Sequence, residues 1–211
     1  MIAGLYGILD MATLARRGLR LRPVADALID AGVRVLQLRW KDAPAAALLE
    51  AARTLGSRIA ARGGLFIVND RADVAALAGA GGVHLGQTDL PVGAARRVLP
   101  ASARVGVSTH NLEELRRALA AGADYVGFGP VFPTASKPNP DPVVGLEGLA
   151  EAVRLAAPVP VVAIGGITEE TMPQVAGTGA AAAAVIGDLL AWGEPGARAS
   201  ALSAAFAAGA P

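Results

Sequence analysis

The sequence contains no cysteine, only two histidines and few aromatic residues (4%). The lack of cysteine excludes disulfides, thiolate metal sites and cysteine nucleophiles. It fits a reducing compartment, and we expect a cytoplasmic protein. His84 and His110 alone make a poor set of metal ligands. With so few aromatic side chains, the core must be filled by Ala, Leu, Val and Gly, which suits helices packed closely on strands.

The chain also lacks a strong charge of either sign and a long apolar run. Its 19 basic and 18 acidic residues give a net charge of +1, without a basic tract, so nucleic acid and acidic membrane surfaces are poor partners. The apolar stretch 179–193 is too short to span a membrane and contains Asp188. The N-terminal segment lacks a basic region and is interrupted by Asp10, so we do not expect a signal peptide.

Short runs typical of strands alternate with longer helical patterns along the whole chain. The predicted strands are 5–9, 33–39, 65–68, 82–85, 104–107, 124–128, 159–163 and 181–186. The predicted helices are 24–31, 43–62, 72–78, 92–98, 112–121, 146–156, 169–176 and 189–207. Ala-Gly pairs at 31–32, 80–81 and 121–122 are expected to end helices, because glycine adopts the left-handed conformation there.

Eight such units predict parallel strands in a closed (β/α)8 barrel, a single domain over residues 1–211 with an Ala-rich C-terminal helix and tail. A doubly wound open sheet is the alternative, but it often has a glycine-rich first turn, whereas this turn is Asp10-Met11-Ala12. In such barrels the reacting groups follow the carboxyl ends of the strands. Polar residues that follow the carboxyl ends of the strands are therefore the candidate site residues.

The second strand ends with polar side chains on one face. Because side chains alternate along a strand, Gln37, Arg39 and Lys41 share the face that we expect to point into the barrel. Leu36, Leu38 and Trp40 share the other, against the helices. Two clustered cations on an inward face favour an anionic ligand. The alternative is that Lys41 is solvated and Arg39 pairs with a structural carboxylate.

Two aspartates end consecutive strand units. Asp70 follows Asn69 after the third strand, and Asp89 follows the fourth. Neighbouring strands lie about 5 Å apart, so two carboxylates at adjacent ends can hold one Mg²⁺, which completes its shell with phosphate oxygens and water. Alternatively, each aspartate caps the helix after it.

Hydroxyls and glycines follow the later strands. Ser108, after the fifth strand, can donate to a phosphate, or else Ser108, Thr109 or Asn111 merely caps the next helix. His84 lies within the fourth strand and is assigned a supporting role. Gly165-Gly166 and Gly187, after the last two strands, predict a backbone phosphate cradle.

The longest irregular stretch is 130–145, rich in Gly and Pro, with Thr134, Ser136 and Lys137. A loop of this length is usually functional when ordered, and hydroxyls plus one lysine suit a phosphorylated ligand. A plain surface linker is the alternative. The cationic site and the neutral cradle together suggest two phosphorylated substrates of different charge.

With these motifs in view, the chain resembles the thiamine phosphate synthase family. The matching stretches are LQLRWK (36–41), VNDRADVA (68–75), GVHLGQTDLP (82–91), VGVSTHN (105–111), GADYVGFGPVFPTASK (122–137), VGLEGL (144–149), PVVAIGGI (160–167) and AVIGDL (184–189). The resemblance implies a (β/α)8 fold and a Mg²⁺-dependent transferase. It implies that hydroxymethylpyrimidine pyrophosphate is joined to a thiazole phosphate, with release of pyrophosphate.

The resemblance also assigns residues. The family's pyrimidine-pyrophosphate contacts fall on Gln37, Arg39, Lys41, Asn69, Ser108 and Lys137, and its Mg²⁺ ligands on Asp70 and Asp89. Its thiazole-phosphate contacts fall on Thr134, Ser136, Gly166, Ile186 and Gly187. Trp40 stands where the family commonly has Glu, Ser136 often appears as Thr, and Gly187 replaces a usual Ser. The backbone N–H remains at 187, so we expect altered thiazole-phosphate affinity rather than lost activity.

Three other functions are weighed against this one. A thiazole tautomerase of the same superfamily does not need Arg39, Lys41, Asp70, Asp89 and Lys137 together. A non-catalytic regulator that binds a thiamine precursor is a second alternative, and a sugar-phosphate epimerase is a third. The sequence does not give the oligomeric state and leaves a homo-oligomer open.

Lys137 provides the first test. We expect it to form, with Arg39, Lys41 and Ser108, the catalytic set, whose positive charge offsets that growing on a departing diphosphate. Replacing Lys137 with alanine is expected to lower turnover by 100-fold or more, about the effect of removing one charge-stabilising donor. Steady-state pyrophosphate release measures this, and unchanged turnover would remove Lys137 from the mechanism.

Overall fold

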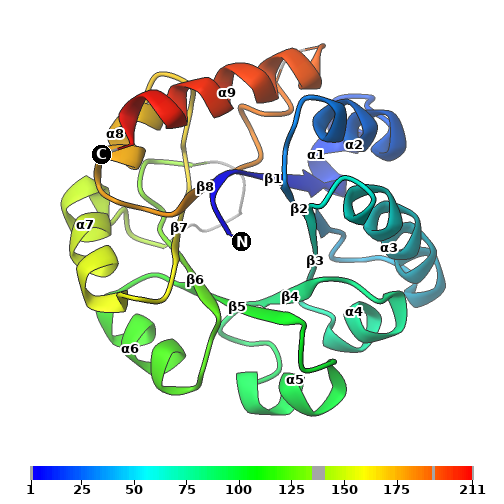
Figure 1. Cartoon of the computed structure of the whole chain (residues 1–211), viewed down its shortest axis with the longest axis horizontal. Helices are drawn as coiled ribbons and strands as arrows, with labels where there is room; N and C mark the ends of the chain where they lie inside the picture. The colour runs from blue at the N-terminus through cyan, green and yellow to red at the C-terminus, as the bar shows by residue number, and fades with distance from the viewer. Residues whose placement is uncertain (1, 135–140, 192, 211) are drawn as a thin grey trace.

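The computed structural model describes residues 2–134, 141–191 and 193–210. In this part of the chain, eight parallel strands close into a barrel in the order β1 to β8, with β8 pairing back onto β1. Figure 1 looks along this ring of strands, with the helices outside it. The predicted (β/α)8 barrel is confirmed and the open-sheet alternative is excluded.

The strands are short and each is followed by helical structure. They are β1 (Gly4–Asp10), β2 (Val35–Arg39), β3 (Leu65–Asn69), β4 (Gly82–Leu85), β5 (Arg104–Thr109), β6 (Tyr125–Phe128), β7 (Val161–Ile164) and β8 (Ala182–Val185). The helices are α1 (Met11–Arg16), α2 (Leu21–Asp30), α3 (Ala45–Ala60), α4 (Ala72–Ala78), α5 (Val92–Val98), α6 (Leu112–Ala120), α7 (Gly145–Ala156), α8 (Met172–Gly177) and α9 (Pro195–Gly209). No helix among the described residues is long and apolar enough to cross a membrane.

Several predicted bounds require correction. The turn expected at 10–12 is the start of α1, whose first turn is capped by the Asp10 carboxylate accepting from the Thr13 N–H. A helix of six residues is too short to show a clear period in the sequence. The predicted helix 169–176 begins only at Met172, and the predicted helix 189–207 only at Pro195. Gly79, at φ 64°, ends α4 in place of the predicted pair at 80–81.

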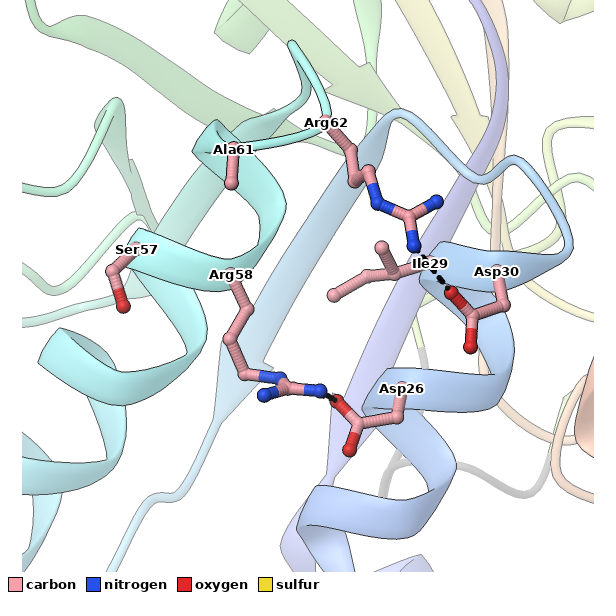
Figure 2. A pocket seen from close by; sticks show the side chains of 7 residues that line it. All are labelled: Asp26, Ile29, Asp30, Ser57, Arg58, Ala61 and Arg62. Atoms are coloured by element: carbon pink, nitrogen blue, oxygen red, sulfur yellow. Dashed lines mark hydrogen bonds and ion pairs between the residues drawn. The ribbon is translucent and has the colours of Figure 1, made fainter.

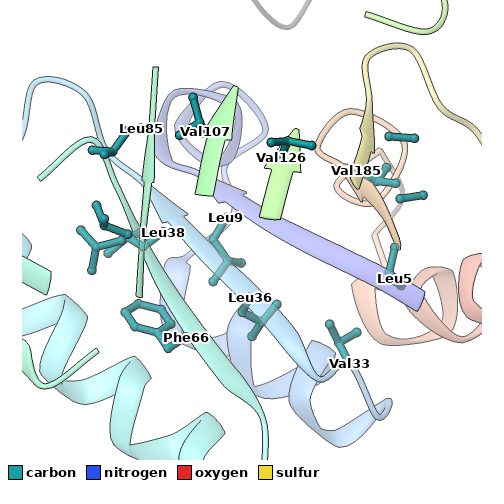
Figure 3. Close-up of a cluster of buried hydrophobic side chains, with 14 of the residues drawn as sticks. Leu5, Leu9, Val33, Leu36, Leu38, Phe66, Leu85, Val107, Val126 and Val185 are labelled. Atoms are coloured by element: carbon teal, nitrogen blue, oxygen red, sulfur yellow. The ribbon is translucent and has the colours of Figure 1, made fainter. Parts of the chain in front are cut away.

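The apolar side chains form two layers, because successive residues of each strand point to opposite sides of the barrel wall. The larger layer lies between the strands and the helices and includes Leu36, Leu38 and Phe66 (Figure 3). The smaller layer fills the barrel interior and includes Tyr6, Ile67 and Tyr125. Burial of both layers supplies the main stabilisation of the barrel.

Glycine at position 106 is required by the packing inside the barrel. A Cβ there would lie 2.1 Å from the Tyr125 ring, which is fully buried. Gly93, on α5, has no neighbouring atom within 4 Å of such a Cβ. The two positions therefore form a matched pair, one crowded and one open.

We expect Gly106→Ala to lower the free energy of unfolding by about 1–3 kcal/mol, because the added methyl group overpacks the interior. Gly93→Ala is expected to leave it unchanged or raise it by up to about 1 kcal/mol, because alanine favours the helix. Urea unfolding followed by circular dichroism measures both. Equal effects of the two substitutions would contradict this account of the interior.

Candidate active site

The carboxyl ends of the strands surround a cavity of about 950 Å³. Within the described part of the chain, every predicted site residue lines it: Gln37, Arg39, Lys41, Asn69, Asp70, Asp89, Ser108, Thr134, Gly166, Ile186 and Gly187. Ser136 and Lys137 lie outside the described residues. The structure thus brings to one place eleven residues that the sequence distributes over 150 positions.

The alternation predicted along β2 is confirmed. Gln37, Arg39 and Lys41 line the cavity, whereas Leu36 and Leu38 are buried in the layer beneath the helices. The same parity brings Asn69 of β3 and Ser108 of β5 to the cavity.

Arg39 is paired with a carboxylate that the sequence analysis did not assign to the site. Its Nη1 donates to Asp10 Oδ1 over 2.6 Å, and the Thr13 hydroxyl donates to Asp10 Oδ2 over 2.7 Å. Burial alone would raise the pKa of Asp10, but these hydrogen bonds together hold it below its ordinary value of 3.8. Asp10 is the last residue of β1. The rule that site residues lie at the carboxyl ends of the strands therefore also predicts Asp10 as a site residue.

The two predicted metal ligands lie together at the ends of β3 and β4. Lys41 Nζ lies 3.0 Å from Asp70 Oδ2, and Asp89 Oδ2 accepts the Gly86 N–H over 2.6 Å. The pKa of Asp70 lies above its ordinary value: burial is the main cause, the Asp89 carboxylate adds to it, and Lys41 opposes it. The site therefore holds a half-buried carboxylate beside a second one, an arrangement that a cation would stabilise.

The alternative in which both aspartates are helix caps is excluded. Helix α4 follows Arg71 and helix α5 follows Pro91, and neither helix has a side-chain cap. Asp70 is, moreover, the single non-glycine residue with positive φ in the described chain, at 65°. Such strained backbone persists where surrounding contacts impose it and is concentrated at functional sites.

A metal ion would depend on ligands other than the protein. Among the described residues, no group of three or more His, Cys, Asp or Glu side chains is placed to hold one. Asp70 and Asp89 are the two groups that could do so, and this number suits Mg²⁺, which usually keeps water and substrate oxygens.

Ser108 is not needed as a helix cap, because Asn111 caps α6 by accepting the Glu114 N–H over 2.9 Å. Its hydroxyl oxygen lies 2.9 Å from His84 Nε2. This contact gives the supporting role predicted for His84 a structural basis. The Gln87 side-chain amide donates to the Ser108 carbonyl over 2.6 Å.

The long loop and the glycine cradle are built against one another. The Phe132 N–H donates to the Gly165 carbonyl over 3.0 Å, and a Cβ on Gly166 would lie 2.4 Å from the Pro133 carbonyl oxygen. Gly166 also has φ 65°, so both its conformation and its surroundings require glycine. At its far end the loop is closed by a bond of 2.9 Å from the Val144 N–H to the Pro130 carbonyl. Thr134 is thereby held beside the cradle.

A second, smaller groove lies outside the barrel between α2 and α3 and measures about 340 Å³ (Figure 2). Its charged lining is already paired, Arg58 with Asp26 and Arg62 with Asp30. Both pairs join the two helices across the groove. We assign it a structural role.

A closed (β/α)8 barrel with a polar cavity at the carboxyl ends of its strands defines an enzyme of the TIM-barrel class. The model of the family described as thiamine monophosphate synthase matches residues 5–189. The chain belongs to this family.

Named relatives agree with this membership. Thiamine-phosphate synthase from Anaeromyxobacter dehalogenans is 53% identical over 189 residues, 89% of this chain and 84% of that protein. Thiamine-phosphate synthase from Methanocella arvoryzae is 47% identical over 81% of this chain and 80% of that protein. The structure of thiamine phosphate pyrophosphorylase from Pyrococcus furiosus superposes with a TM-score of 0.86 at 35% identity, over 97% of this chain and 96% of the other.

The Asp10–Arg39 pair yields a prediction about stability. We expect Asp10→Asn to lower the free energy of unfolding at pH 7 by about 3 kcal/mol, because it leaves a largely buried guanidinium without a counter-charge. The folded-state pKa of Asp10 is lowered, so this contribution is present above 3.8 and is lost as the pH falls through the folded-state value. Urea unfolding at pH 7 and in acid measures the difference.

Asp30→Asn is the matched control, because its pair with Arg62 is exposed on both sides. That substitution should cost less than about 1 kcal/mol. Equal losses in the two variants, or a difference for Asp10→Asn that persists fully in acid, would refute the assignment.

Proposed function

We propose that this chain is a thiamine-phosphate synthase, which joins hydroxymethylpyrimidine pyrophosphate to thiazole phosphate and releases pyrophosphate. The main observation behind this proposal is that one cavity contains both a rim with cations and carboxylates at β2–β4 and a glycine cradle at β7–β8. Two phosphorylated ligands of different charge are accommodated by such a division. The family membership and the named relatives support the same reaction.

The diphosphate is assigned to the rim of β2, β3 and β5. Arg39 and Lys41 supply positive charge, and Asn69 and Ser108 supply hydrogen-bonding groups beside them. Asp70 and Asp89 would hold Mg²⁺, which when bound supplies positive charge next to the diphosphate oxygens. Gln37, deeper on the same face of β2, faces the ring of the pyrimidine in this arrangement.

The thiazole phosphate is assigned to the cradle. Gly166, Ile186 and Gly187 line it, with Thr134 contributed by the loop and Ser136 by resemblance alone. Backbone N–H groups can donate to a phosphate there without a charged side chain. The cradle therefore suits a single phosphate, whereas the cationic rim suits the more highly charged diphosphate.

The reaction needs no nucleophile from the protein. The bond between the methylene carbon and the diphosphate oxygen breaks, and its electron pair leaves with the diphosphate. The electron-rich aminopyrimidine bears the positive charge on the carbon, and the thiazole nitrogen then forms the new bond with its lone pair. Arg39, Lys41 and Lys137 offset the charge that grows on the diphosphate.

The alternative functions are weaker. A tautomerase acting on one phosphate ligand has no use for the clustered Arg39, Lys41, Asp70 and Asp89, which lie together at one rim. The metal-binding histidines of an epimerase are not supplied by the two histidines of this chain, because His84 is bonded to Ser108 and His110 to Glu114. A non-catalytic regulator would bind a thiamine precursor without releasing pyrophosphate.

The deciding experiment follows pyrophosphate release from the purified protein with both substrates, with each alone, and with or without Mg²⁺. We expect release only when both substrates and Mg²⁺ are present. Asp70→Asn and Asp89→Asn should each lower kcat/KM by at least 100-fold at fixed Mg²⁺, because the remaining carboxylate binds the ion weakly. Binding of both ligands without release would identify a regulator instead.

Asp73→Asn is the matched control for the metal ligands. Asp73 lies on α4 near Asp70, but it pairs with Arg71 at the surface. Its substitution should leave the rate and its Mg²⁺ dependence within about twofold of wild type. A loss as large as that of Asp89→Asn would show that the aspartate effects do not arise from a metal site.

A further inference from the structure

A continuous chain of hydrogen bonds crosses the barrel interior from Gln37 to Ser108. Gln37 Nε2 donates to the Tyr6 hydroxyl over 2.8 Å, and the Tyr6 and Tyr125 hydroxyls lie 3.1 Å apart. The Tyr125 hydroxyl lies 3.1 Å from His84 Nδ1, and His84 Nε2 lies 2.9 Å from Ser108 Oγ. Five residues from five different strands are thereby joined, and both ends of the chain line the cavity.

Two glycines make room for the rings in this chain. A Cβ on Gly106 would lie 2.1 Å from the Tyr125 ring, and a Cβ on Gly127 would lie 3.2 Å from His84 Cε1. The ring centroids of His84 and Tyr125 are 5.4 Å apart, and those of Tyr6 and Tyr125 are 6.2 Å apart. The interior therefore accommodates these polar rings beside the aliphatic side chains of the inner layer, such as Ile67.

Both tyrosines stay protonated and must each donate one hydrogen. Burial raises the pKa of Tyr6 and that of Tyr125 well above the ordinary value of 10. A buried hydroxyl that cannot donate would lose about 1–3 kcal/mol. The direction of every bond in the chain is therefore set once the direction of one of them is known.

The first bond sets this direction. Gln37 donates to Tyr6, so Tyr6 donates to Tyr125 and Tyr125 donates to His84 Nδ1. An accepting Nδ1 leaves the proton of the neutral ring on Nε2, which then donates to Ser108 Oγ. The Ser108 oxygen already accepts a hydrogen bond, and its own hydrogen is directed to another acceptor.

We propose that this row of hydrogen bonds holds Ser108 as a hydrogen-bond donor to a ligand oxygen in the cavity, with Tyr125 and His84 as positioning residues. The proposal rests on the proposed function for the identity of that oxygen, which belongs to the diphosphate. The reverse direction would turn the Ser108 hydrogen toward His84 and present only lone pairs to an anion. The direction of these hydrogen bonds thus favours an anionic ligand oxygen beside Ser108.

The histidine tautomer tests the proposal without any substrate. The protein has two histidines, so ¹⁵N-histidine labelling gives two imidazole spectra, and His84→Gln identifies that of His84. In wild type we expect the His84 ring to carry its proton on Nε2, with Nδ1 unprotonated and accepting from Tyr125. Tyr125→Phe should admit the Nδ1–H tautomer, because it removes the donor to Nδ1.

Tyr6→Phe is the matched control. It removes the same group from a buried ring, but Tyr125 still has His84 Nδ1 as an acceptor. We therefore expect His84 to remain protonated on Nε2 in this variant. A wild-type His84 protonated on Nδ1, or on both nitrogens at pH 7.5, would overturn the proposal whatever reaction the protein catalyses.

Kinetics then test whether Tyr125 acts through Ser108. Tyr125→Phe should lower kcat about tenfold, the worth of one well-oriented hydrogen bond. In a Ser108→Ala background the same substitution should change kcat by less than twofold, because the group being positioned is already gone. Losses that multiply in the double variant would overturn the positioning role.

The two tests also separate the proposal from the proposed function. If no pyrophosphate is released by the wild type, the proposed function fails, while the tautomer still reports on the chain of bonds. If pyrophosphate is released but His84 carries its proton on Nδ1, the function stands and the positioning proposal is wrong.

Discussion

Pairing between β1 and β8 is the constraint on which the rest of this structure depends. Gly4 lies opposite Ala182 and Gly7 opposite Val185, and this ladder converts a row of strands into a ring. A ring leaves no sheet edge exposed. It also brings the carboxyl end of β8 beside β1, whose last residue, Asp10, lies opposite Arg39 of β2. Without this closure the last strands would not face the first ones and the shared cavity would not exist, whereas the Asp10–Arg39 pair follows from the β1–β2 ladder itself.

The charges of the cavity are organised within the protein itself. Arg39 is held by Asp10, and Lys41 by Asp70. Arg39 is largely buried and is therefore held in position at the rim, which lowers the reorganisation required when an anion binds, whereas the Lys41 side chain is about half exposed. Within the part of the chain that the structure describes, Asp89 forms no ion pair, and its carboxylate accepts the Gly86 N–H. The resulting excess of negative charge at this point is what a divalent cation would neutralise.

Much of the fold and of the cavity lining could be predicted because the rules involved are local. Alternation along β2 separates Gln37 from Leu38, and a polar residue directly after a strand, such as Asp70, must lie at the rim. The interior hydrogen-bond chain was not predictable in this way. Tyr6 and Tyr125 are 119 residues apart, and nothing near either of them in the sequence indicates the other.

The wrong or incomplete predictions, for α1 and for the partner of Arg39, also arise because a local pattern does not show distant contacts. Helix α1 has six residues and is specified by one capping carboxylate, Asp10, which the sequence also allowed as a simple break in an apolar segment. For Arg39, the sequence left both a ligand and a structural carboxylate open, and the structure supplies the carboxylate. Local pattern identifies which side chains reach the cavity, whereas their partners are decided by strands that meet only in the folded barrel.

The backbone bond between Val144 and Pro130 has a consequence for how such a scaffold can diversify. It brings the two ends of the 130–144 segment together at the barrel rim, so the strands and helices on either side are insensitive to the length of what lies between. Changing that length costs only the slowly growing entropy of loop closure. New ligand preferences can therefore arise by insertion or deletion between positions 134 and 141, whereas Val131 must be kept because it is buried in the core.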